Sequence, residues 1–174
     1  MTADVVFSRL VKVEALPRDG LTQSVEATPG ERAALAQQNG LADIAKLAAT
    51  FVLKRSGKGV RVVGTVHAEV TQTCVVSVEP FPVTIDEPVD VRFAQETRDR
   101  PGRAAPEVVA LDVEDAPDPI VDGKVDLGAL AAEFMALSLD PYPRKPGAEF
   151  APPPEEAPAP SPFDALAEIA RKKV

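Results

Sequence analysis

The chain contains a long alternation of apolar and polar side chains that begins at Val60 and runs through the stretch Arg61 to Pro80. One parity is apolar or small: Val60, Val62, Gly64, Val66, Ala68, Val70 and Cys74. The other parity is polar except for Val63: Arg61, Thr65, His67, Glu69, Thr71 and Thr73. Successive side chains of a strand point to opposite faces, so the pattern predicts a strand with a buried face and a solvent face. We expect this strand to lie at the centre of a sheet.

Further strands are predicted on both sides of this stretch. A glycine-containing turn over residues 54–61 joins the central strand to the preceding one, as in a β-hairpin. Pro82 and Pro88 confine the strand after it to a sheet edge or to a break in the ladder. The predicted neighbours are Val5 to Glu14, the end of Leu41 to Leu53, Phe81 to Phe93, and Glu107 to Asp112.

Two helices are predicted from capping residues and helical spacing. Thr28, Pro29 and Glu31 form a capping-box pattern, and Asn39-Gly40 supplies the stop of a helix from Pro29 to about Gln38. Asp126 caps the second helix, which ends near Asp140. Its apolar residues recur at helical spacing: Leu127, Leu130, Ala131, Phe134 and Leu137.

These elements predict an α+β fold, with a mainly antiparallel sheet of five or six strands and two main helices over residues 1–150. Half of the 18 prolines lie between Pro141 and Pro162, so residues 151–162 are expected to be a proline-rich linker. Residues 163–174 have an apolar face and a basic end, which is typical of a short amphipathic helix that forms on docking.

Composition limits the classes of function. The formal net charge of −8 argues against a protein that coats nucleic acid through a large basic face, although a local basic contact stays possible. With a single cysteine the chain has no internal disulfide, which fits a reducing compartment. The first residues lack a long apolar run and no stretch has the length of a membrane span, so we expect a soluble cytoplasmic protein.

The residues show no catalytic or metal-binding pattern. One histidine and one cysteine cannot supply the usual four-ligand zinc site. Cys74 lies on the apolar parity and His67 on the polar one, so the strand does not bring them together as nucleophile and base. Since no catalytic or nucleotide-binding motif is present, the pattern does not favour a hydrolase, and no cofactor or small-molecule substrate is expected.

Two charged stretches are candidate contact surfaces. The predicted hairpin turn carries Lys54, Arg55, Lys58 and Arg61, which is typical either of a solvated tip or of a phosphate-contacting patch on RNA. Between Glu107 and Asp126 the only cation is Lys124, so this stretch is either a solvated loop or a contact for a basic protein. The candidates for a protein contact are Asp112, Glu114, Asp115, Asp118 and Asp122, with Phe163 and Leu166 in the tail.

Two blocks of the sequence resemble the YceD family, the large ribosomal RNA subunit accumulation proteins. The first block runs from Val63-Gly64 through Cys74 to Glu79-Pro80. The second contains Asp126-Leu127-Gly128, Glu133 and Pro141, and ends at Pro143. The acidic run and the ending after Ser161-Pro162 are similar to those of alphaproteobacterial members.

The chain departs from the family in its cysteines. Many members carry one just before the position of Cys74 and one near the end of the last helix. Here Thr71, Gln72 and Thr73 precede Cys74, and Arg144-Lys145 follow the second block. The resemblance therefore implies no metal or redox role for this chain.

The resemblance implies a non-catalytic factor that supports the accumulation of large-subunit ribosomal RNA. We expect it to bind precursor ribosomal RNA through the basic hairpin, or a ribosomal protein through the acidic stretch. A protein-only interaction module, such as a chaperone for a basic ribosomal protein, is the alternative. It predicts binding to an isolated protein partner in the absence of RNA.

Overall fold

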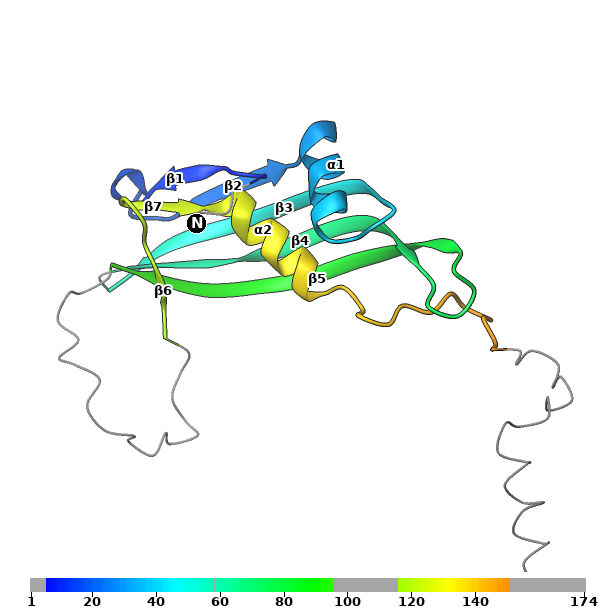
Figure 1. Cartoon of the computed structure of the whole chain (residues 1–174). Helices are drawn as coiled ribbons and strands as arrows, with labels where there is room; N and C mark the ends of the chain where they lie inside the picture. The colour runs from blue at the N-terminus through cyan, green and yellow to red at the C-terminus, as the bar shows by residue number, and fades with distance from the viewer. Residues whose placement is uncertain (1–5, 58, 96–115, 151–174) are drawn as a thin grey trace, which may run out of the picture.

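The computed structural model describes residues 6–57, 59–95 and 116–150. Its main sheet has the strand order β2-β3-β4-β5-β6, antiparallel except that β6 runs parallel to β5 (Figure 1). The strands are β2 (Leu21–Glu26), β3 (Asp43–Ser56), β4 (Gly59–Thr73), β5 (Pro80–Ala94) and β6 (Asp118–Pro119). A separate antiparallel pair joins β1 (Leu10–Lys12) to β7 (Lys124–Asp126). The helices are η1 (Val13–Ala15), α1 (Pro29–Gln38) and α2 (Leu127–Leu137).

The α+β class and the mostly antiparallel sheet are confirmed, and the predicted central strand is β4, which pairs with both β3 and β5. The first strand is shorter than predicted. Before Leu10 the backbone bonds to α2 instead of to a strand, because the Arg9 amide donates to Asp126 and the Arg9 carbonyl accepts from the Leu127 amide. Strand β2 was not predicted. The expected strand over 107–112, the linker and the tail lie outside the described residues.

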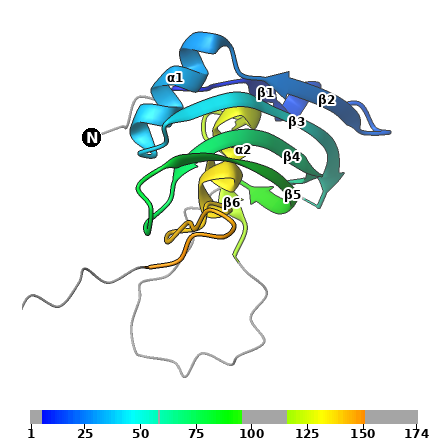
Figure 2. The same cartoon turned by 90° about the vertical axis from the view of Figure 1, so that its right-hand side faces the viewer.

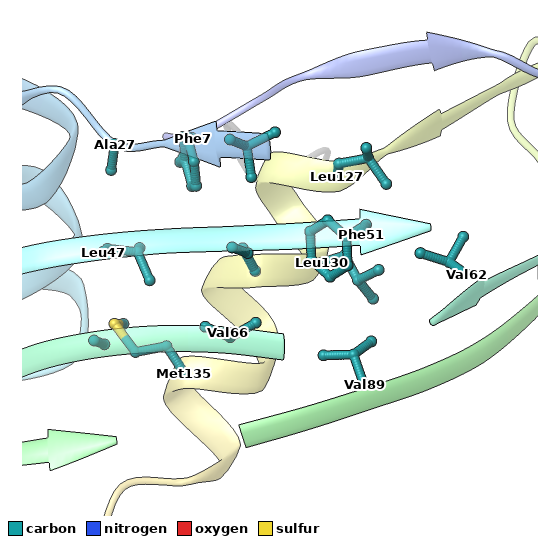
Figure 3. Close-up of a cluster of buried hydrophobic side chains, with 14 of the residues drawn as sticks. Phe7, Ala27, Leu47, Phe51, Val62, Val66, Val89, Leu127, Leu130 and Met135 are labelled. Atoms are coloured by element: carbon teal, nitrogen blue, oxygen red, sulfur yellow. The ribbon is translucent and has the colours of Figure 1, made fainter. Parts of the chain in front are cut away.

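One face of the main sheet, called here the covered face, is packed against α2. In Figure 1 this helix crosses the strands diagonally, and it contacts β3, β4 and β5. Leu127, Leu130 and Met135 lie on its inner side, against the buried side chains of the strands (Figure 3). These strand residues include Leu47, Phe51, Val62, Val66 and Val89.

Helix α1 lies beside the start of β3, as both views show (Figures 1 and 2). The predicted capping box is present. The Glu31 amide donates to the Thr28 hydroxyl, and the Thr28 amide donates to the Glu31 carboxylate at 2.8 Å. The same carboxylate accepts hydrogen bonds from the Arg9 guanidinium. Together with the Thr28 amide, these bonds lower the pKa of Glu31 to about 2.

Gly64 permits a close approach at the centre of the sheet. It pairs with Phe51, whose ring is fully buried on the covered face. A Cβ atom at Gly64 would lie 2.2 Å from the Thr50 carbonyl oxygen and 2.7 Å from Cδ1 of Phe51. Any side chain at this position would therefore displace backbone or a fully buried ring of the core.

We predict that Gly64→Ala lowers the free energy of unfolding by about 2 kcal/mol, because the added methyl group overpacks a filled core. Urea denaturation followed by circular dichroism measures this difference. Gly30→Ala is the matched control, since a Cβ at Gly30 meets no atom within 4 Å. We expect the control to leave stability unchanged or slightly raised. Equal losses for the two variants would contradict this role of Gly64.

Candidate nucleic-acid interface

The second face of the main sheet, called here the open face, is exposed over β2 to β5. Its side chains are mainly polar or charged, and no other described element packs over it. The central apolar residue is Val63, 42% exposed, as the alternation of the sequence predicted. Since extended strands hold their side chains in fixed rows, this face presents charges at defined positions.

The strand register places three cations in one row on the open face. Lys54 of β3 pairs with Arg61 of β4, and Arg61 pairs with Arg92 of β5. All three side chains are exposed. We call these three residues the cationic row. It crosses the end of the sheet at the β3–β4 turn, as expected for two of the predicted RNA-contact residues.

Arg92 was not recognised from the sequence. Its polar parity within Phe81 to Phe93 was the available signal, but its position beside Arg61 depends on the register between β4 and β5. A shift of one residue would move Arg92 to the covered face. Sequence alternation alone does not determine that register.

Arg61 also forms an ion pair with Asp90. Its Nε donates to the carboxylate at 2.7 Å, and a second nitrogen donates to the other oxygen. This bidentate pair raises the pKa of Arg61 and lowers that of Asp90. The guanidinium stays accessible, because the Arg61 side chain is 54% exposed. The pair therefore fixes the direction of the guanidinium while leaving it open to solvent.

The other two hairpin candidates lie differently. Arg55 has the opposite parity to Lys54, and its guanidinium donates to the backbone carbonyls of Val13, Glu14 and Leu16. These bonds tie the hairpin to η1, which gives Arg55 a structural role. Lys58 lies outside the described residues. Contact of either residue with RNA stays a prediction.

His67 lies between two acids further along the open face. Its Nδ1 lies 2.7 Å from the Asp86 carboxylate and its Nε2 lies 3.5 Å from that of Glu69. The hydrogen bond to Asp86 is the main cause of a raised pKa for His67, because it favours the charged imidazolium. This end of the face is consequently a mixed-charge cluster, unlike the cationic row.

Two of the acidic protein-contact candidates are described. Asp118 lies in β6 opposite Phe93, and Asp122 lies in the turn before β7. Both side chains are exposed. The remaining candidates of this set lie outside the described residues: Asp112, Glu114, Asp115, Phe163 and Leu166.

The first block of the resemblance comprises the end of β4 and the turn that follows it, and its cysteine is buried, as predicted. The Cys74 sulfur accepts from the amides of Val76 and Ser77, each at 3.4 Å. Hydrogen bonds lower the pKa of Cys74 to about 6, and the bond from the Ser77 side chain has the largest effect. Glu79 follows the turn and pairs with Lys145 at 2.8 Å, and Pro80 opens β5. The turn is thereby joined to the chain after α2.

The second block forms the start of α2. The Asp126 carboxylate accepts from the amides of Gly128 and Ala129, and Leu127 is fully buried. A Cβ at Gly128 would lie 2.8 Å from the Phe7 carbonyl oxygen, so glycine lets the N-terminal segment pass. Pro141 follows Asp140, whose carbonyl accepts from Gln72, and Glu133 is exposed on α2. These residues are mainly structural, with Glu133 left as a surface acid.

Two other kinds of feature are absent from the residues described above. No group of three or more histidine, cysteine or acidic side chains there is arranged to hold a metal ion. Among the same residues, no helix has the length and apolar character needed to cross a membrane.

The comparison with protein families decides the identification. A family model described as "Large ribosomal RNA subunit accumulation protein YceD" matches residues 62–169, more than half of the chain. The chain belongs to the YceD family. No curated protein and no solved structure matches it.

Membership of the YceD family suggests a role in the accumulation of large-subunit ribosomal RNA, and this family is not known as catalytic. The matched range holds both blocks, Val63 to Pro80 and Asp126 to Pro143. It begins one residue after Arg61, so Arg92 is the member of the cationic row that lies within it.

We predict that the pKa of His67 lies above 6.5 and falls towards that value in Asp86→Asn, measured by NMR titration of the imidazole resonances. A raised folded-state pKa means that the contribution of this contact to stability is present at low pH. The contribution is lost as pH rises through the folded-state pKa. An unchanged midpoint in Asp86→Asn would show that Asp86 is not the cause. Asp43→Asn is a control, because it removes an exposed acid on β3 that does not contribute to the raised pKa of His67.

Proposed function

We propose that this protein is a non-catalytic factor that supports large-subunit ribosomal RNA accumulation by binding precursor RNA through the cationic row. The observation that carries this proposal is the alignment of Lys54, Arg61 and Arg92 on the open face. Neighbouring strands lie about 4.8 Å apart, so three adjacent strands hold these cations across a width of roughly 10 Å. An RNA backbone that crosses the row can place more than one phosphate within this width.

The ion pair with Asp90 supports a positioned contact at this row. Arginine recognises phosphate through a planar fork of donors, and a bidentate carboxylate limits the directions in which that fork can point. The acids of the open face also lower the positive potential around the row, which disfavours indiscriminate binding to nucleic acid. The net charge of −8 is consistent with a small, local RNA contact.

We predict that Lys54→Gln/Arg61→Gln/Arg92→Gln weakens binding to a transcribed large-subunit precursor RNA by at least about tenfold at low salt. Filter binding at several salt concentrations measures both the affinity and its salt dependence. Because each lost phosphate contact removes about one unit from the slope of log K against log salt, the slope should fall by about two to three units. The same variant should lose ribonuclease-sensitive co-migration with large-subunit precursors on a sucrose gradient.

Lys12→Gln/Lys46→Gln/Arg144→Gln is the matched control. It removes the same number of positive charges at exposed positions outside the cationic row. Equal affinities for the two triple variants would show that net charge alone governs binding. Association with precursor particles that survives ribonuclease and both triple substitutions would favour a protein partner, which is the alternative function.

A further inference from the structure

A groove lies at the β6 end of the molecule, between the start of α2, the β1–β7 pair and the segment from β6 to β7. Its volume is about 370 Å³. Leu10, Phe93, Val121 and Leu130 provide apolar lining. Leu10 is 59% exposed and Val121 is 65% exposed, so the groove has unusually accessible aliphatic side chains at its edge. Concave sites lined by apolar side chains with a few polar groups are typical of binding sites.

A tight turn presents Val121 at the edge of this groove. Val121 and Lys124 form an antiparallel bridge, and the Lys124 amide donates to the Val121 carbonyl at 2.9 Å. The two residues between them, Asp122 and Gly123, have φ values of 49° and 70°. Positive φ at both central positions is the geometry of a type I′ turn. Val121 therefore flanks a defined turn, and its side chain is exposed there.

Acidic side chains surround the apolar lining. Asp118, Asp122 and Glu133 are exposed at its edge. The Asp126 carboxylate also lies there, but it is engaged by Ser8 and by the amides of the α2 cap. Lys124 is the one cation among the lining residues. The lining therefore carries more acidic than basic side chains, which disfavours phosphate and favours lysine and arginine.

We propose that this groove binds a lysine- and arginine-rich segment of a separate protein, with an aliphatic side chain of that segment inserted against Leu10 and Val121. The apolar lining of the groove and its surrounding acids together define the chemistry of the ligand. An apolar anchor fills a mainly apolar space, and flanking cations reach the surrounding carboxylates. Basic segments that carry isolated aliphatic residues meet both requirements.

Most of the groove lining belongs to the part of the chain that the family model matches. Every residue that lines the groove, except Leu10, falls within the matched range 62–169. The groove is also separate from the cationic row. Arg92 and Phe93 are successive residues of β5, so Arg92 points to the open face and Phe93 to the covered face. The protein site thus goes beyond the proposed RNA contact, and each can fail without the other.

The test measures fluorescence anisotropy of a labelled peptide of about 16 residues with the full chain, without RNA. The peptide contains lysine, alanine and leucines at helical spacing. One comparison peptide replaces the lysines by glutamate, and another replaces the leucines by alanine. We expect binding of the first peptide alone, weakened by added salt because its flanking ion pairs are exposed.

Two variants of the protein locate the binding site. Asp118→Asn/Asp122→Asn/Glu133→Gln should raise Kd at least about fivefold, since several exposed ion pairs are lost together. Asparagine at 122 tolerates the left-handed backbone of the turn. Leu10→Ser/Val121→Ser should weaken binding about as much by removing the apolar contact. The matched charge control is Asp19→Asn/Glu26→Gln/Asp43→Asn, at exposed positions outside the groove lining, and it should change Kd by less than about twofold.

Three results would overturn this proposal. Equal binding of the leucine-free basic peptide would show charge attraction without a groove. Equal Kd values for the acid variant and its charge control would place the site elsewhere. Peptide binding that appears only in a Leu166→Asp/Ile169→Asp protein would show that the chain's own tail competes for the groove. Circular dichroism of each variant verifies that its fold is retained.

Discussion

The carboxylate of Asp126 is the contact on which the arrangement of the two helices depends. It accepts from the amides of Gly128 and Ala129, which are otherwise unpaired at the first turn of α2. It also accepts from the Ser8 hydroxyl and, at 2.7 Å, from the Arg9 amide. Arg9 in turn bonds to Glu31 in the capping box of α1. One continuous polar network therefore links the N-terminal segment to the starts of both helices.

Several residues of the family blocks have structural roles, within this network or elsewhere in the core. Asp126 satisfies the helix start, Leu127 enters the core, and Gly128 leaves room for the backbone at Phe7. Gly64 performs a similar role for Phe51 on the covered face. Because these positions are committed to folding, candidate contacts with other molecules lie on exposed side chains around them. The open face and the groove meet that condition.

The sequence predicted the elements that have a regular alternation of apolar and polar residues or clear capping residues. The alternation from Val60 identified β4 and its buried side, and the capping residues identified α1 and α2. Strand β2 was missed because it buries one residue, Val25, and so lacks an alternating pattern. The first strand was predicted too long because its alternation did not reveal the backbone bonds between Arg9 and α2. Both errors arise from edge segments, where tertiary contacts decide the structure.

The candidate sites likewise combine residues that a local pattern reveals with residues that only tertiary contacts bring together. Lys54 and Arg61 were recognisable as a basic hairpin, whereas Arg92 joins them only through the register of two long strands. Similarly, the acidic stretch was visible, but its apolar neighbours come from Leu10, Phe93 and α2, which are distant in sequence. Local composition shows whether a surface segment is acidic or basic. Strand pairing decides which residues lie together on that surface. That distinction explains why the sequence indicated charged segments without locating a site.

The separation of charge across the sheet has a consequence for assembly. Arg92 and Phe93 place a cationic surface and an acidic, apolar groove on opposite sides of one strand end. The two proposed ligands carry opposite charges, so the two proposed contacts do not compete for the same molecule. Ribosomal particles combine RNA with lysine- and arginine-rich proteins. Under the two proposals, the cationic row binds RNA and the acidic groove binds a basic protein segment, so one domain would hold both components of such a particle.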